Sequence, residues 1–170
     1  MTMPKTQKHA VPPADRTPFA MLAEAGVHAI VGYQLAQATI VTNQVFDERV
    51  GRRGGLRRVE FTILALVQGN PDVTARQLAR ALAVTPPNIA VWLDKLEARG
   101  LIARQRSTSD ARMQHVRITR AGGTLVDRSG QQLLEGEQAA LSALSTAERA
   151  MLVELLHKVA MSRKRVEAAD

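Results

Sequence analysis

The sequence predicts a mostly α-helical protein with one small two-stranded β-ribbon, and three observations indicate this fold class. Apolar residues recur at intervals of three and four over most of the 170 residues, which is the period of a helix with one buried face. Aromatic residues make up only 3% of the chain, and its β-branched residues are scattered among helix-favouring Ala, Leu, Gln, Glu and Arg. Two extended stretches, 101–106 and 113–118, flank the polar segment 107–111 and predict a ribbon.

The N-terminal part predicts an arm followed by a long helix. Residues 1–18 contain four prolines and few apolar side chains, which is typical of a flexible arm. From Phe19 to Phe46 the apolar residues follow the helical period. A stripe of that length needs another helix to pack against, and two partners remain open: a helix of the same chain or a helix of a second subunit.

The segment 56–100 predicts three helices with clear boundaries. The first ends at the sequence GNPD. Thr74 and Gln77 have the spacing of a capping box, which begins a short second helix. Thr85 is the expected N-cap of the third helix, because Pro86 follows at the first helical position, where a missing amide hydrogen costs nothing.

The last two of these helices fit a helix-turn-helix over residues 75–93. Ala79 is small where two helices must cross closely, Val84 is apolar in the turn, and Ile89 is apolar on the inner face. Ala83 departs from the pattern, because a glycine often adopts the left-handed conformation at this position.

Two more helices follow the ribbon. Thr119 is the expected cap of a helix that continues to about residue 141. Ser145 and Glu148 form another capping box and begin a last helix. One side of that helix is apolar, with Met151, Leu152, Leu155, Leu156 and Val159.

The positive charge of the chain is concentrated in its centre. The formal net charge is +7, and the segment from Arg52 to Arg120 holds 13 Lys and Arg against 5 Asp and Glu. Such a concentration is typical of a module that binds phosphates, and chance clustering on a soluble surface is the alternative.

Composition and spacing exclude several function classes. The chain has no cysteine, which rules out disulfides and thiolate metal sites and fits a cytoplasmic protein. No apolar run is long enough to cross a bilayer, and the N-terminus lacks the apolar core of a secretory signal. The histidines are too far apart for a metal site, and we find no nucleophile–base pair and no phosphate-binding glycine loop. The sequence therefore predicts neither an enzyme nor a bound cofactor or metal.

The chain resembles the MarR family of bacterial winged helix-turn-helix transcription regulators. The resemblance rests on the segment LARALAVTPPNIAVWLDKLEARGLI, on the wing pattern DAR followed by VRIT, and on the TRAG that opens the next helix. It implies a homodimer on double-stranded DNA. It also implies a division into an N-terminal arm (1–18), a dimerisation helix (19–50), a winged helix-turn-helix (51–120), further dimerisation helices (121–160) and a flexible tail (161–170).

The resemblance implies which residues meet DNA. The start of the recognition helix should face the bases with Thr85, Pro87, Asn88 and Val91, while Lys95 lies nearer the backbone. Asn88 is the one side chain there that suits a bidentate contact to adenine, and an exposed polar residue without a role is the alternative.

The wing and the arginines around it complete the expected DNA surface. Arg112 should enter the minor groove, with Asp110 orienting it or serving as an ordinary turn residue. Arg106 borders the same ribbon. Phosphate contact or simple surface solubility is open for Arg57, Arg58, Arg76 and Arg80.

A small aromatic acid or similar molecule is the effector that the resemblance implies. His28 and Tyr33 on the first helix, with Arg53 or Arg57 near the second, could orient a carboxylate or a phenol. For His28 the alternative is a histidine satisfied at a helix interface. Trp92 is expected to pack in the core beneath the recognition helix.

The sequence thus predicts a cytoplasmic, DNA-binding regulator, a repressor that such a ligand releases from a palindromic operator. The alternative function is a winged-helix module for protein interaction or dimerisation, without specific DNA binding. The wing arginine and the central positive charge argue against it.

Overall fold

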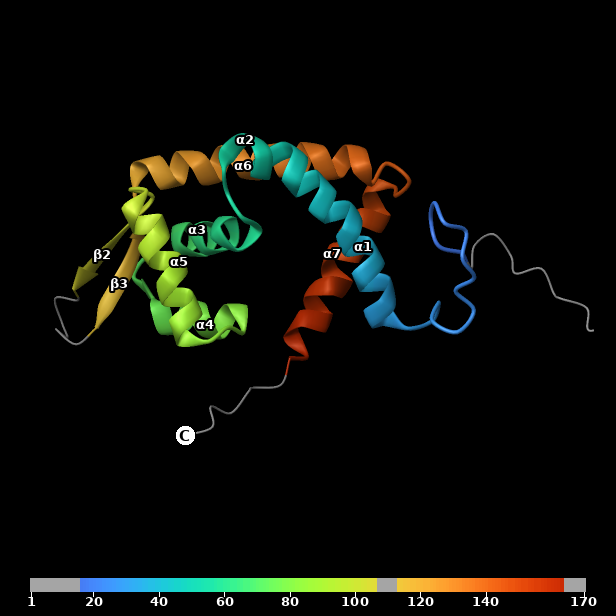
Figure 1. Cartoon of the computed structure of the whole chain (residues 1–170), viewed down its shortest axis with the longest axis horizontal. Helices are drawn as coiled ribbons and strands as arrows, with labels where there is room; N and C mark the ends of the chain where they lie inside the picture. Colours follow the sequence, from blue (N-terminus) through green and yellow to red (C-terminus); the bar gives the residue numbers. More distant parts are fainter. Residues whose placement is uncertain (1–15, 107–112, 164–170) are drawn as a thin grey trace, which may run out of the picture. The chain divides into compact units, whose positions relative to one another are not determined.

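The structure is a computed structural model that describes residues 16–106 and 113–163, and it confirms the predicted fold class. The chain divides into two compact units, residues 1–44 and residues 45–170. The elements, labelled in Figure 1, are α1 (Val31–Phe46), the π-helix η2 (Asp47–Gly51), α2 (Arg52–Gly54), α3 (Arg58–Gly69), β1 (Val73–Thr74), α4 (Ala75–Leu82), α5 (Pro86–Ala98), β2 (Ile102–Arg106), β3 (Gln114–Ile118), α6 (Arg120–Ala140) and α7 (Thr146–Met161).

The first helix begins at Val31, so the prediction of a helix from Phe19 is wrong. Phe19 and Met21 have positive φ angles of 65° and 54°, which a helix does not allow. The chain instead turns back on itself, and a β-bridge joins Arg16 to Ala23. The apolar spacing alone did not reveal this turn, because it reports side-chain period and not backbone conformation. Most of the predicted arm, residues 1–15, lies outside the described residues.

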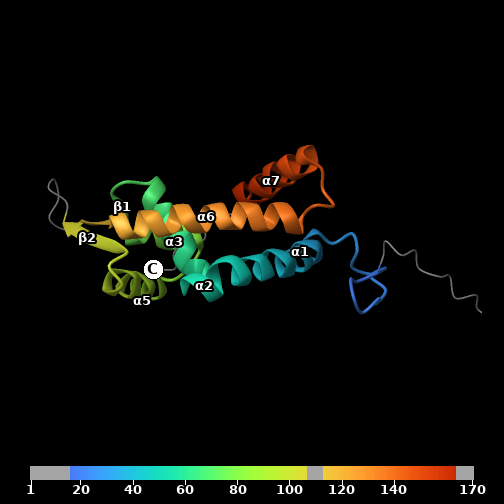
Figure 2. The ribbon, with the colours of Figure 1, turned by 90° about the horizontal axis from the view of Figure 1, so that it is seen from above.

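The helical part of the chain continues past residue 50, where the dimerisation helix was expected to end. Helix α1 continues directly into the π-helix η2 and then into α2. The turn comes at Gly55, whose φ of 59° is a left-handed conformation that favours glycine. Both views show η2 and α2 lying beside α6 (Figures 1 and 2), and Gly136 of α6 faces Val45 and Arg49 without room for a Cβ atom.

The core of the second unit lies between α3, the helix pair α4–α5 and the small sheet. Each of these elements contributes side chains that are almost completely buried, and burying one such Leu, Ile or Val stabilises a fold by about 1.5–3 kcal/mol. Within these elements the most buried are Ile63, Leu64, Val67, Leu78, Ile89, Leu93, Leu96, Ile102 and Val116.

The sheet has three antiparallel strands in the order β1–β3–β2, one more than predicted. Strands β2 and β3 form the expected ribbon, with Ile102 opposite Ile118 and Arg106 opposite Gln114. The additional strand β1 pairs Val73 with Val116. Two residues carry no period of their own, so only their pairing with β3 identifies them as a strand.

Helix α6 begins where the sequence predicted, at a tight contact with the end of α5. Thr119 caps α6 by accepting a hydrogen bond from the Gly122 N–H (3.0 Å), and its hydroxyl donates to the Gly100 carbonyl (2.7 Å). A Cβ atom on Gly122 would lie 2.1 Å from the Leu101 carbonyl oxygen. Only glycine therefore lets the first turn of α6 approach the backbone this closely.

Helix α7 has the capping box predicted from Ser145 and Glu148. The Ser145 hydroxyl (2.7 Å) and the Ser145 N–H (2.8 Å) both donate to the Glu148 carboxylate, and these two bonds lower the pKa of Glu148. The Glu148 N–H donates in return to the Ser145 hydroxyl (3.3 Å). No residue of α7 is buried in the single chain. Exposed apolar residues include Met151, Leu152, Val153, Leu155, Leu156, Val159 and Met161.

No helix in the described part of the chain combines the length and the hydropathy that crossing a bilayer requires.

Gly122→Ala is expected to lower the free energy of unfolding by about 1–3 kcal/mol, because the new methyl group must displace the backbone at Leu101. The matched control is Gly123→Ala, where nothing lies within 4 Å of the added atom. That change should be neutral or stabilise by up to about 1 kcal/mol, since alanine is the better helix former. Urea unfolding measures both variants, and equal stabilities would contradict the close contact.

Candidate nucleic-acid interface

The helix-turn-helix forms as the sequence predicts, beginning with the cap of α4. The Thr74 N–H donates to the Gln77 side-chain oxygen (2.8 Å), and the Gln77 N–H donates to the Thr74 hydroxyl (3.3 Å). Ala79 and Ile89 are buried where α4 and α5 meet. The capping box and the small residue at the crossing therefore fix where α4 starts and how closely α5 approaches it.

Ala83 takes the left-handed conformation that glycine often adopts at this turn. Its φ is 52° and its ψ is 46°, and the turn is closed by a hydrogen bond from the Val84 N–H to the Ala79 carbonyl (3.0 Å). An L-residue with a Cβ atom adopts this conformation at a cost of about 1–2 kcal/mol. The packing of α5 on the core must therefore hold the turn in place.

Helix α5 presents one face to the core and the other to solvent. Ile89, Leu93 and Leu96 are buried. All of the residues expected to meet DNA from this helix lie on the exposed side: Thr85, Pro87, Asn88, Val91 and Lys95. Trp92 packs against the core while partly exposed, as its predicted structural role requires.

Two polar side chains at the start of α5 are not used by the fold. Thr85 occupies the N-cap position, but its hydroxyl makes no capping hydrogen bond. Among the described residues, no polar group contacts the side chain of Asn88. Both side chains can therefore bind an external partner without breaking a bond within the protein.

The acidic residues around this surface are neutralised. Each described carboxylate between Arg52 and Arg120 forms an ion pair with an arginine. The pairs are Arg99–Glu60 (3.3 Å), Arg117–Asp72, Arg104–Asp94 (2.6 Å) and Arg104–Glu97 (3.6 Å).

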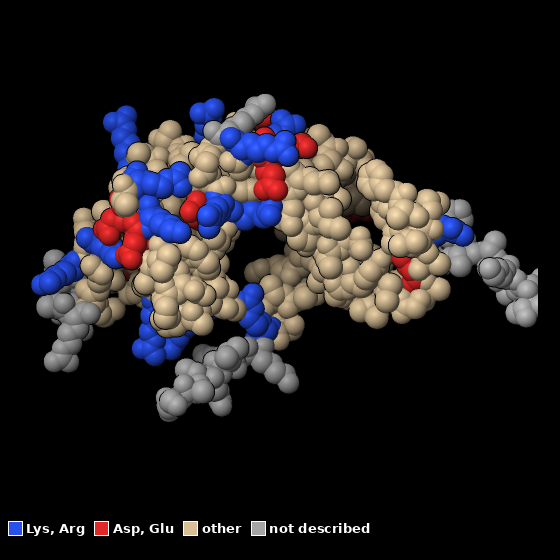
Figure 3. All heavy atoms as spheres, viewed as in Figure 1, with Lys and Arg blue, Asp and Glu red and all other residues tan. Residues whose placement is uncertain are grey.

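Several basic residues of the same region take part in no ion pair within the described chain, and they include Arg76, Arg80, Lys95 and Arg106. In Figure 3, Lys and Arg lie along the upper side and at the lower end of the part of the molecule that contains α3, α4 and α5, with a mostly uncharged surface between them. Because the nearby acids are already paired, these cations leave a positive surface around the exposed face of α5. Such a surface attracts a polyanion.

Arg104 anchors the ribbon to the recognition helix. Its backbone N–H donates to Glu97 (3.1 Å), and its guanidinium donates to Asp94 (2.6 Å). The sequence pattern alone assigned no partner to Arg104. The spacing of Asp94 and Glu97, one turn apart on α5, is the signal that could have identified the anchor. The wing tip with Asp110 and Arg112 lies outside the described residues.

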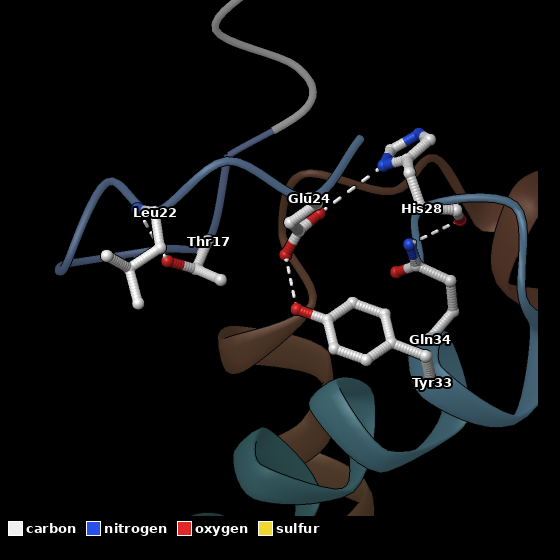
Figure 4. Close-up of polar contacts among 6 residues, drawn as sticks. All are labelled: Thr17, Leu22, Glu24, His28, Tyr33 and Gln34. Atoms are coloured by element: carbon white, nitrogen blue, oxygen red, sulfur yellow. Dashed lines mark hydrogen bonds and ion pairs between the residues drawn. The ribbon is translucent and has the colours of Figure 1, made fainter. Parts of the chain in front are cut away.

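His28 and Tyr33, the expected ligand residues of the first unit, both contact the buried carboxylate of Glu24 (Figure 4). The Tyr33 hydroxyl donates to Glu24 (2.8 Å), and the His28 Nδ1 lies 3.3 Å from the other carboxylate oxygen. The hydrogen bond to Glu24, together with loss of hydration, raises the pKa of Tyr33. Sequence reasoning missed Glu24, although its spacing of four from His28 is a signal for a pair on one helical turn.

Arg57, the third residue expected to hold a ligand, belongs to the second unit. It occupies the N-cap position of α3, where its backbone N–H donates to Glu60 (2.9 Å). Arg58 forms an ion pair with Asp47 (2.9 Å) and lies over the ring of Phe46. A phosphate contact by Arg58 would therefore compete with contacts inside the protein.

Comparisons with known proteins agree with this geometry. Residues 56–113 match the model of the MarR family. A protein of Thauera aromatica, named as a candidate transcriptional regulatory protein for the hcr operon, is 27% identical over 153 residues, which cover 90% of this chain and 92% of that protein.

Solved structures show the same fold. The transcriptional repressor CouR bound to a 23-mer DNA duplex is 28% identical, with a TM-score of 0.73 over 82% of this chain and 98% of that one. BpsR of Bordetella bronchiseptica, whose DNA binding is regulated by 6-hydroxynicotinic acid, has a TM-score of 0.70 at 23% identity, over 79% of this chain and 96% of that one.

Ala83→Gly is expected to raise the free energy of unfolding by about 0.5–1 kcal/mol, because glycine adopts the left-handed turn without the cost of a Cβ atom. Ala90→Gly is the matched control, since Ala90 lies within α5 and is exposed. There glycine should destabilise by about 0.5–1 kcal/mol. Urea unfolding of the two variants should give opposite signs, and a loss at both positions would refute the strain at Ala83.

Proposed function

We propose that this chain, whose residues 56–113 match the model of the MarR family, is a transcription regulator of that family and binds a palindromic double-stranded DNA operator as a homodimer. The observation that carries the proposal is the exposed face of α5. This face holds the side chains of Thr85 and Asn88, which the fold does not use. The nearby acids Asp94 and Glu97 are paired with Arg104, so they do not neutralise the other cations around this face.

The DNA contacts follow from this face. Asn88 reads a base in the major groove with Thr85 beside it, while Pro87 and Val91 offer apolar contact to thymine methyl groups. Lys95, Arg76 and Arg80 bind phosphates and fix the orientation of the module. Arg106 and the wing residues Asp110 and Arg112 extend the contact to the neighbouring minor groove.

The dimer follows from α7. A helix with no buried residue and an apolar surface along most of its length is unstable by itself in water. A second copy of the chain covers it, and a twofold dimer presents two recognition helices to one face of DNA. We also propose that the chain divides into the arm, the dimerisation helices and the winged module that the resemblance implies.

The effector that we propose is a small aromatic or phenolic acid that releases the repressor from DNA. The Glu24 carboxylate beside Tyr33 and His28 supports this ligand class, because the carboxylate of such a ligand offers the same kind of acceptor oxygens to these side chains, in competition with Glu24. Such a ligand acts only if it binds the DNA-free form better than the bound form. We assign no catalytic activity and a cytoplasmic location, in keeping with relatives that are transcription regulators.

Two single variants, Asn88→Ala and Lys95→Ala, test DNA binding. Operator fragments selected from the source genome by the wild-type protein serve as probes in a fluorescence anisotropy titration at several salt concentrations. Asn88→Ala should cost about 1–3 kcal/mol on the selected site and relax the preference at one base pair of each half-site. Lys95→Ala should weaken binding to all sequences alike and reduce the slope of affinity against salt by about one.

Two results would contradict the proposal. If the wild-type protein bound duplex DNA with no dependence on salt, or not at all, the interaction-module alternative would replace it. If Asn88→Ala weakened binding equally on every sequence, Asn88 would contact only the DNA backbone.

Leu152→Glu with Leu156→Glu is expected to convert the dimer into a monomer, because two charges would then lie on one apolar side of α7. The matched control is Glu154→Ala with Lys158→Ala, which removes an exposed ion pair four residues apart on the opposite side of the same helix. Sedimentation equilibrium distinguishes the two states. A dimer that survives the leucine substitutions would place the interface elsewhere.

A further inference from the structure

The end of α7 contacts the helix-turn-helix of the same chain. Arg163 follows Ser162, the residue that closes α7, and its guanidinium donates from Nη1 to the carbonyl of Ala81 at 3.1 Å. Ala81 lies in the last turn of α4. The contact joins two residues that are 82 positions apart in the sequence.

Arg163 supplies a donor where α4 lacks one. The carbonyls in the last turn of a helix have no N–H partner further along the helix. In α4 the N–H groups of Ala83 and Val84 turn back to Arg80 and Ala79, at 3.2 and 3.0 Å. The Ala81 carbonyl accepts a hydrogen bond from Arg163 instead. A cation at a helix C-terminus also interacts favourably with the helix dipole.

The position of this bond gives it a role beyond closing one helix. Ala81 lies two residues before Ala83, the left-handed residue that directs the chain from α4 into α5. A side chain held at Ala81 therefore acts at the base of the turn that aims the recognition helix. The other end of the link is α7, the helix that a second copy covers in the proposed dimer.

We propose that Arg163 is a positioning residue that fixes the helix-turn-helix against α7 and thereby sets the spacing between the two recognition helices of the dimer. The proposal rests on the proposed function, because α7 holds the dimer together. A regulator whose operator has two half-sites needs that spacing to match the DNA. One exposed hydrogen bond narrows the range of spacings between the two recognition helices but does not fix a single value. Removing this bond should therefore weaken operator binding by about two- to tenfold.

The spacing can be measured in the protein without DNA. The chain has no cysteine, so Ala98→Cys introduces a single site for a nitroxide label at the exposed end of α5. Pulsed electron paramagnetic resonance then gives the distribution of distances between the two labels of a dimer. Adding Arg163→Ala is expected to broaden that distribution, and Arg163→Lys, which can still donate to the carbonyl, should narrow it again.

Arg149→Ala is the matched control. Arg149 also lies on α7 and donates to a backbone carbonyl, that of Gln138 at 3.4 Å, on the side of the helix–helix connection. Arg149→Ala should leave the distribution of distances between the labels as it is in the parent protein. A distribution that Arg163→Ala does not change, or that Arg149→Ala broadens equally, overturns the proposal. If no distance between labels is found and sedimentation shows a monomer, the proposed dimer is wrong, and the proposed role of Arg163 is wrong with it.

A salt titration separates positioning from direct contact with DNA. On the selected operator, Arg163→Ala should weaken binding by about two- to tenfold while the slope of affinity against salt stays unchanged. A slope reduced by about one would show that Arg163 binds a phosphate, which overturns the positioning role while leaving the proposed function intact.

Discussion

The buried face of α5 is the constraint on which the rest of the molecule depends. Ile89, Leu93 and Leu96 enter the core, where they join the buried side chains of α3, α4 and the sheet. The helical period then forces Asn88 and Lys95 outward. The strained turn before α5, the anchored ribbon after it and the positive surface around it all depend on that helix lying in one orientation. Stability and recognition therefore use opposite sides of the same thirteen-residue helix.

Much of this arrangement could be predicted from the sequence, because it depends on local signals. The capping boxes at Thr74 and Ser145 and the cap at Thr119 are each complete within four residues, and all three form as predicted. The left-handed turn at Ala83 was not predicted, because alanine counted there as a departure from the motif, and the structure shows that this alanine nevertheless adopts the left-handed conformation. The exposed face of α5 followed from the period of its apolar residues.

What the sequence could not predict depends on residues far apart or on backbone conformation. The strand β1 exists only through its pairing with β3, more than forty residues later. The turn at Phe19 and Met21 replaces a helix that the apolar spacing favoured. The arginine links from Arg104 and Arg163 join separate elements, so charge counts could not show which arginines are held by the fold and which remain for a ligand.

The claim that the outer face of α5 lies against DNA is tested most directly by cutting DNA from that face. In the cysteine-free chain, Ala90→Cys carries an iron chelate that cleaves nearby DNA, and Gln131→Cys places the same chelate on the exposed surface of α6. If the outer face of α5 lies against DNA, the chelate on α5 should produce two clusters of cleavage about one helical turn apart, roughly ten base pairs, and the chelate on α6 should produce little. Cleavage from α6 but not from α5 in a bound complex would contradict it.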